Sequence, residues 1–252
     1  MTSVRLKFQN PSQEKLAAYL DMPEKGEPKA FALFAHCFTC GKNLKSMVNI
    51  NKALTEHGIA VMRFDFTGIG ESQGDFSETN FTSNIEDLIS AAEYLEDEYE
   101  APKLLIGHSM GGAAVIQAAH DIHSIKAVAT IAAPSSPDHL GHILHRTRSQ
   151  AESKGAAEVT IGGKTFTLKK QFFENLDKVK MREKIRSLNR PILILHAPND
   201  DTVHVDNAAE IFQSARHPKS YISLDKAGHL LLEERDARYA GALIATWAER
   251  YF

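Results

Sequence analysis

The sequence contains only two cysteines in 252 residues, too few for the disulfide framework of a small secreted protein. No apolar run approaches the roughly 18 residues that span a bilayer, so no membrane helix is expected. Residues 1–5 lack the charged head and apolar core of a secretory signal peptide. A formal net charge of −3 gives no basic field that would attract nucleic acid or an anionic membrane surface. These absences favour a protein of the reducing cytoplasm.

Hydrophobic residues make up 43% of the chain, enough for a full core, and the length suits one large α/β domain or two small ones. Apolar runs alternate with segments of helical periodicity, which is typical of a mostly parallel sheet with helices on both faces. The opening segments 4–8 and 15–20 instead predict an antiparallel pair of strands. Ser83 and Glu86 predict a capping box at a helix start. The later runs expected to form strands are 30–35, 59–64, 104–107, 125–132, 191–196 and 221–224.

The segment from about 134 to 189 breaks this alternation. It begins with a histidine-rich stretch at 139–145. The pattern at 158–168 predicts a β-hairpin, and a charged helix is expected after it. We therefore predict a single domain over residues 1–252, in which the segment is an insertion that caps the active edge of the sheet.

The stretch 104–112 carries the pattern G-x-S-x-G around Ser109. An apolar run ends at Gly107, and a helical run rich in glycine and alanine follows the serine. This context predicts a nucleophile elbow, in which a strand turns sharply into a helix. Glycine is needed at 107 and 111, because a Cβ at Gly107 or Gly111 would clash in so tight a bend. The serine would then lie near a helix N-terminus, whose partial positive charge suits a developing oxyanion.

A serine hydroxyl becomes an effective nucleophile when a base takes its proton and an acid orients that base. In this architecture the chain order is nucleophile, acid, histidine. His229 follows the last expected strand and is the candidate base. Asp200 is preferred over Asp201 as the acid, because its spacing from the preceding strand is one that this architecture often uses. Asp138, which follows an earlier strand, is a further candidate for the acid.

An oxyanion hole needs two backbone N–H groups. One is expected from Met110, the residue after the nucleophile. The other is expected from the loop after the 30–35 strand, and counting from His36 places it at Phe38. Both roles belong to the backbone, so the side chains of Phe38 and Met110 are free to serve packing or an acyl pocket.

Cys37 and Cys40 form a C-x-x-C pattern within that same loop. Such a pair beside a strand–helix unit can be a redox centre, and the alternative is two small residues in a tight loop. A metal site is not expected, because there is no second cysteine pair. Gly68 and Gly70 faintly resemble a dinucleotide-binding loop, but glutamine occupies the third glycine position. Asp65 is expected to order its own loop.

With these features in place, the chain resembles the α/β-hydrolases from end to end. Three motifs are similar more narrowly to the hydrolases found fused or adjacent to OsmC-type organic hydroperoxide reductases in bacteria. They are H-C-F-T-C at 36–40, R-F-D-F-T-G-I-G-E-S at 63–72 and G-H-S-M-G-G at 107–112. The resemblance implies a cytoplasmic serine hydrolase without a cofactor. It does not indicate a particular substrate, because substrates are poorly defined across this branch of the family. Because the chain ends just past the hydrolase, any OsmC-type partner is expected to be a separate polypeptide.

The sequence thus predicts a carboxylesterase that hydrolyses a small-molecule ester of short or medium acyl length through an acyl-enzyme. Ser109 is the expected nucleophile, His229 the base and Asp200 the orienting acid, with no metal or cofactor. Neither nucleic acid nor a membrane is expected as a partner. Two alternatives stay open: a thiol or redox function of Cys37-x-x-Cys40 linked to hydroperoxide detoxification, and a non-catalytic module that binds a small molecule.

Overall fold

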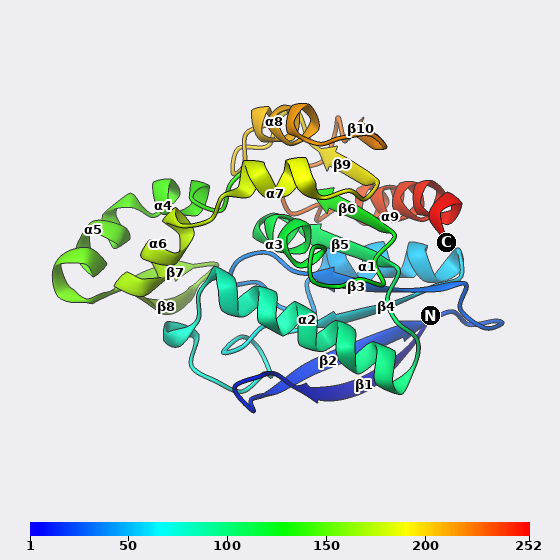
Figure 1. Cartoon of the computed structure of the whole chain (residues 1–252), viewed down its shortest axis with the longest axis horizontal. Coiled ribbons are helices and arrows are strands. Elements are labelled where there is room, and N and C mark those ends of the chain that lie inside the picture. Colours follow the sequence, from blue (N-terminus) through cyan, green and yellow to red (C-terminus); the bar gives the residue numbers. More distant parts are fainter.

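A computed structural model describes residues 1–252, and its centre is one eight-stranded sheet (Figure 1). The first two strands pair antiparallel, the second is antiparallel to its other neighbour, and all further pairs are parallel. The predicted mostly parallel sheet and the opening antiparallel pair are thus confirmed. In order across the sheet, the strands are β1 (Thr2–Gln9), β2 (Lys15–Met22), β4 (Ile59–Phe64), β3 (Ala30–Ala35), β5 (Leu104–His108), β6 (Ala127–Ile131), β9 (Ile192–His196) and β10 (Lys219–Ser223).

Helices cover both faces of the sheet, as the alternation of patterns predicts. None of them combines the length and hydropathy that crossing a bilayer demands. One face carries α1 (Lys45–Glu56) and α9 (Glu234–Ala248). The other face carries α2 (Phe81–Glu98), α3 (Met110–Ala118), α7 (Met181–Ser187) and α8 (Asp206–Ser214). The chain also contains two short 3₁₀ helices, η1 (Phe76–Glu78) and η2 (Glu249–Tyr251).

The inner strands are apolar along their whole length because helices cover them on both sides. Every residue of β3, β4, β5, β6 and β9 is buried. Successive side chains of a strand point to opposite faces, so one strand feeds two cores. In β5, Leu104 and Ile106 join the core under α1 and α9, whereas Leu105 joins the core under α2 and α3.

The start of α2 differs from the predicted capping box of Ser83 and Glu86. The helix begins at Phe81, and Asn80 is its N-cap. The Asn80 side chain accepts a hydrogen bond from the Ser83 N–H, and the Ser83 hydroxyl accepts one from the Asn80 N–H. Ser83 therefore occupies the third helical position of the box rather than the cap, a role that glutamate or glutamine usually fills.

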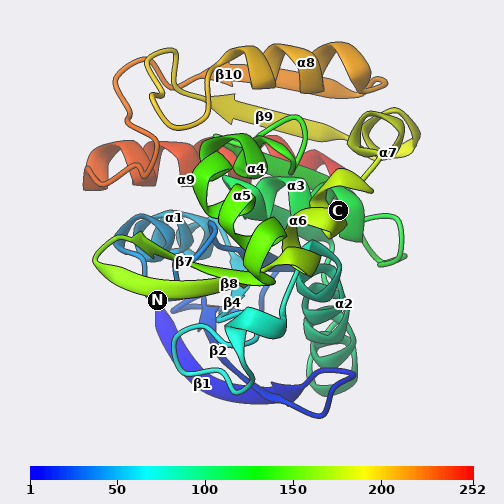
Figure 2. The same cartoon turned by 90° about the vertical axis from the view of Figure 1, so that its left-hand side faces the viewer.

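The chain between β6 and β9 leaves the sheet, and we call residues 134–189 the cap segment. Figure 2 shows its first part in front of the sheet. The predicted hairpin is confirmed, with Gly162 and Gly163 both at positive φ in its two-residue turn, which matches the twist of paired strands. Before α7, the cap segment contains α4 (His139–Ile143), α5 (His145–Lys154), the hairpin strands β7 (Ala156–Ile161) and β8 (Lys164–Lys169), and α6 (Lys170–Asp177).

The parallel strands all end at the same edge of the sheet, so the loops that follow them gather there. The β3–α1 loop starts at His36 and the β4–η1 loop at Asp65. Ser109 follows β5 directly, and the loops after β9 and β10 contain Asp200 and His229. Residues far apart in the sequence are thereby placed around one edge.

Candidate active site

Ser109 occupies the sharp turn between β5 and α3 with φ 55° and ψ −125°, a left-handed conformation that is costly for a residue with a side chain. A hydrogen bond to the neighbouring strand β6 stabilises this conformation, because the Ser109 N–H donates to the Ile131 carbonyl at 2.8 Å. A Cβ built on Gly107 would lie 2.3 Å from the Gly111 oxygen, and one on Gly111 would lie 2.4 Å from the Ala35 oxygen. The two glycines therefore allow α3 to start directly against β5 and β3.

His229 lies between the serine and a carboxylate. Its Nε2 is 3.1 Å from the Ser109 Oγ, and its Nδ1 is 2.8 Å from Oδ2 of Asp200. A neutral imidazole with its proton on Nδ1 would donate to the carboxylate and accept from the hydroxyl. The structure thus brings the three expected residues into one hydrogen-bonded chain, with the hydroxyl next to a base that can accept its proton.

Of the three carboxylates considered for the acid, only Asp200 reaches the histidine. It is 3% exposed, and its Oδ1 accepts from the N–H groups of Thr202 and Val203 at 2.9 Å each. Burial raises the pKa of Asp200, but the hydrogen bonds from His229 and from those N–H groups outweigh it and lower the pKa below its usual range. Asp201 is exposed and bonds only the hydroxyl of Thr202, and Asp138 stands at the start of α4 without a bond to the histidine.

His108, to which the sequence assigned no role, secures the backbone of the candidate base. Its ring is 4% exposed, and Nε2 donates to the His229 carbonyl at 2.7 Å. Burial lowers the pKa of His108 to about 4, so the ring is neutral at ordinary pH. The only sequence signal is its position directly before the nucleophile, because the contact joins residues 121 positions apart.

The free energy of unfolding is expected to fall as the pH is lowered from about 6.5 to about 4, with His108 contributing. An unfolded chain takes up a proton at this imidazole near pH 6.5, whereas the folded chain does so only near pH 4. The contribution is about 3 kcal/mol, fully present above pH 6.5 and lost toward pH 4. Urea unfolding between pH 7 and pH 4.5 measures it, and His108→Gln, which does not titrate but keeps an N–H donor, should show a shallower dependence. His123→Gln removes an exposed histidine as the control, and equal slopes in both variants would contradict the assignment.

The two expected oxyanion donors border the same site. Met110 is the first residue of α3, where backbone N–H groups have no partner within the helix. The Phe38 N–H finds no acceptor within the chain. The Phe38 ring packs between Phe76 and Phe172, with centroids 5.7 and 5.5 Å away, so it fixes this part of the loop against η1 and α6.

Cys37 and Cys40 are joined by a disulfide within the β3–α1 loop. Neither cysteine is free, so in this state the pair offers no thiolate to a substrate. No cluster of three or more histidine, cysteine or acidic side chains is arranged to hold a metal ion. The serine, the histidine and the carboxylate are the candidate groups for chemistry at this site.

A cavity of about 690 Å³ opens above Ser109. Leu140, Ile143 and Leu144 of the cap segment form its apolar wall, with Leu230 beside His229. Residues of the β3–α1 loop also line the cavity. A second hollow of about 770 Å³ lies between α7 and α8, is mostly polar and contains none of the three residues. The first cavity is thus the one in which an acyl chain could reach the serine.

Comparison with known proteins places the chain among hydrolases. Residues 26–139 match the family described as serine aminopeptidase, S33. The esterase domain of a Rhodothermus marinus protein is 46% identical, with a TM-score of 0.82 over 100% of this chain and 99% of that one. Mouse palmitoyl-protein thioesterase ABHD10, mitochondrial, is 25% identical over 241 residues, which are 92% of this chain and 78% of the relative.

A more distant structure shares the fold alone. Est1E from Butyrivibrio proteoclasticus, solved with ferulic acid bound, is 19% identical with a TM-score of 0.81 over 98% of each chain. The likeness to Est1E bears on the fold, and the likeness to the esterase domain bears on hydrolysis as well. They do not bear on an OsmC-type protein, so that association stays a prediction.

Proposed function

This chain belongs to the α/β-hydrolase family, and from that premise we propose that it is a serine hydrolase of carboxylic esters. One observation carries the proposal: the unbroken hydrogen-bond chain from the Asp200 carboxylate through His229 to the Ser109 hydroxyl. A buried carboxylate behind a histidine that faces a strained serine is the arrangement that nucleophilic catalysis requires.

The reaction starts when the Ser109 Oγ attacks the carbonyl carbon of the ester and His229 Nε2 takes the hydroxyl proton. Asp200 stabilises the imidazolium that forms and keeps the ring oriented. The carbonyl oxygen becomes an oxyanion, which the N–H groups of Phe38 and Met110 stabilise. Oriented donors of this kind strengthen as the charge develops, so they lower the barrier rather than only bind substrate.

Collapse of the tetrahedral intermediate breaks the ester C–O bond. The imidazolium gives its proton to the leaving alcohol, and the acyl group stays on Ser109. A water molecule then attacks the acyl-enzyme, with His229 again taking a proton, and a second tetrahedral intermediate releases the carboxylic acid. The serine recovers its proton, so the enzyme returns unchanged.

The substrate class follows from the cavity. Its lining by aliphatic side chains of the cap segment and its volume of about 690 Å³ suit an acyl chain of short or medium length. The relatives add support: one is named an esterase domain and another a thioesterase, so oxygen and sulfur leaving groups are both within reach of the same chemistry.

The test is to trap and locate the acyl-enzyme. A fluorophosphonate probe should label one residue, and peptide mapping by mass spectrometry should place the adduct on Ser109. With p-nitrophenyl butyrate, rapid mixing should give a burst of p-nitrophenol close to one equivalent per active site if deacylation limits turnover. An adduct on a different residue, or no adduct and no ester turnover, would contradict the proposal.

A further inference from the structure

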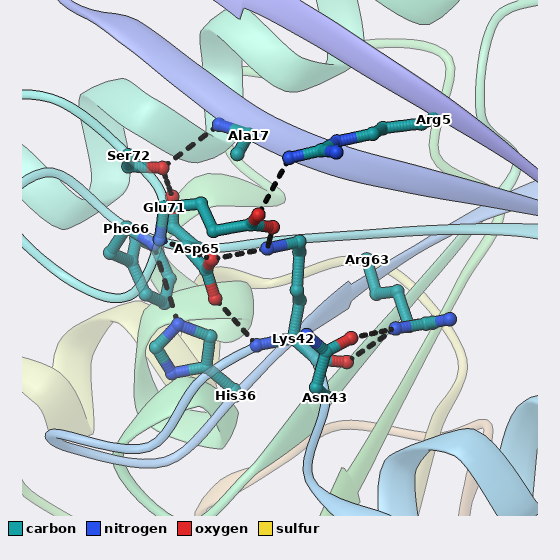
Figure 3. Close-up of polar contacts among 10 residues, drawn as sticks. All are labelled: Arg5, Ala17, His36, Lys42, Asn43, Arg63, Asp65, Phe66, Glu71 and Ser72. Atoms are coloured by element: carbon teal, nitrogen blue, oxygen red, sulfur yellow. Dashed lines mark hydrogen bonds and ion pairs between the residues drawn. The ribbon is translucent and has the colours of Figure 1, made fainter.

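A buried ammonium lies beside the site and takes no part in the reaction described above. Lys42 belongs to the β3–α1 loop, four residues after Phe38, and is 1% exposed. Its Nζ contacts Oδ2 of Asp65 and Oε2 of Glu71, each at 2.5 Å (Figure 3). The hydrogen bond and charge of Lys42 lower the pKa of the Glu71 carboxyl. A lysine paired with two carboxylates is not free to bind a substrate anion, so its role concerns the loop that carries it.

Asp65 is the centre of this cluster. It follows β4, is 2% exposed, and accepts from the Lys42 backbone N–H at 2.7 Å as well as from the ammonium. Its Oδ2 also accepts from the Glu71 N–H at 3.0 Å. A Cβ on Gly70 would lie 2.3 Å from that same oxygen, so the β4–η1 loop closes tightly around the carboxylate. One side chain thus fastens two loops together.

The start of the β3–α1 loop is fastened to the same place. His36 Nδ1 donates to the Cys37 carbonyl at 2.8 Å. Its Nε2 accepts from the Phe66 N–H at 3.4 Å (Figure 3). At the other end, Arg63 Nη1 donates to the Lys42 carbonyl at 2.7 Å. The loop that contains Phe38 is therefore held at both ends by residues of β4 and of the loop that follows it.

We propose that Asp65 is a positioning residue for the oxyanion hole: it holds the β3–α1 loop so that the Phe38 N–H faces the oxygen of the reacting carbonyl. The inference rests on the proposed function, because a hole is needed only if the serine forms a tetrahedral intermediate. Asp65 lines the same cavity as Ser109, but its hydrogen bonds go to Lys42 and Glu71 and none goes to Ser109 or His229.

This role predicts a specific kinetic signature. A donor of the oxyanion hole acts on the transition state, so displacing it lowers kcat and leaves ground-state binding nearly unchanged. Deleting such a donor costs about 10²- to 10³-fold in kcat, and displacing it by loosening its loop should cost less. A residue that merely stabilised the fold would alter the amount of folded protein without altering the kcat of the folded fraction.

The experiment compares Asp65→Asn with Asp87→Asn in the full chain. Asp87 is equally buried and accepts from the Thr67 N–H at 2.9 Å, so it fastens the same β4–η1 loop, but it has no bond to the β3–α1 loop. With p-nitrophenyl butyrate, Asp65→Asn is expected to lower kcat about 10- to 100-fold with KM within about twofold. Asp87→Asn should keep kcat within about twofold.

Two further measurements keep the test decisive. A short trifluoromethyl ketone, whose adduct places an oxyanion in the hole, should bind Asp65→Asn more weakly in proportion to the loss of kcat. Hydrogen–deuterium exchange of residues 36–44 should be faster in Asp65→Asn and unchanged in Asp87→Asn. If Asp65→Asn fails to fold, the pair Asp65→Asn with Lys42→Met removes both buried charges, which is better tolerated than leaving one unpaired, and should show the same kcat loss.

Unchanged kcat and unchanged exchange in folded Asp65→Asn would overturn the proposal, as would equal kcat losses in the Asp65 and Asp87 variants. A wild-type protein that hydrolyses no ester and takes no fluorophosphonate would overturn the proposed function and the catalytic role with it. The exchange measurement would still decide in that case whether Asp65 holds the loop, so the two failures are distinguishable.

Discussion

Replacing Ser109 by alanine is expected to lower kcat for p-nitrophenyl butyrate by about 10⁶-fold, to near the rate of the reaction in buffer. The physical reason is that the alanine variant has no atom to form the acyl-enzyme, so the reaction loses its covalent route and keeps only binding and the oxyanion donors. Alanine has the same Cβ as serine, so the strained backbone at φ 55° is no less favourable and the elbow should persist. Steady-state hydrolysis and fluorophosphonate labelling measure the effect.

Ser135→Ala is the matched control for this variant. Ser135 lies after β6 and its hydroxyl bonds Asn207 and Glu210, away from the hydrogen-bond chain of the site. Its replacement should keep kcat within about twofold, so a loss confined to Ser109→Ala identifies the nucleophile. Labelling that persists in Ser109→Ala at the wild-type rate would show that a different residue reacts.

Replacing Asp200 by asparagine is expected to lower kcat by about 10⁴-fold. The asparagine oxygen could still accept from the N–H groups of Thr202 and Val203, but its NH₂ group would then face His229. An NH₂ donor favours the imidazole tautomer with its proton on Nε2, which can no longer accept from the Ser109 hydroxyl. The missing negative charge also leaves the imidazolium unstabilised. KM should change little, because Asp200 does not line the cavity.

Asp201→Asn gives the sharpest control for Asp200, since it is the same change one residue along the chain. Asp201 is exposed, and its only bond is with the hydroxyl of its neighbour Thr202. The variant should keep kcat within about twofold. If Asp201→Asn were inactive and Asp200→Asn active, the acid would be assigned to the wrong carboxylate.

The fold followed from sequence because its determinants are local. A strand covered on both faces, such as 30–35, is continuously apolar, and G-x-S-x-G between a strand and a helix permits few other geometries. The start of α2 was misplaced because Asn80 and Ser83 are both good caps, and the sequence does not say which side chain turns back on the helix. In the folded chain Asn80 is the cap, and the Ser83 hydroxyl accepts from its N–H.

The site was predictable where chain order fixes it and unpredictable where tertiary contacts do. Ser109, Asp200 and His229 follow β5, β9 and β10 in the chain order that this architecture uses, so each candidate could be named from its position. Nothing local distinguishes His108 from the other eleven histidines, because its partner is a backbone carbonyl in a distant loop. The contact of Asp65 with Lys42 was likewise not predictable from the sequence. The sequence indicated that Asp65 orders its own loop, and the structure shows that it also accepts a hydrogen bond from the β3–α1 loop.

The entry and exit points of the cap segment have a consequence for the cavity. The chain leaves the sheet after β6 and returns in β9, and these two strands are direct neighbours, with Val128 paired to Ile192. The bridge contributes α7 and buried residues such as Phe172 and Phe173 to the core on one face of the sheet, but the pairing of β6 with β9 does not depend on its length. Changes at Leu140, Ile143 and Leu144, which line the cavity from this segment, would therefore alter the shape of the cavity while Ser109, His229 and Asp200 keep their places after other strands.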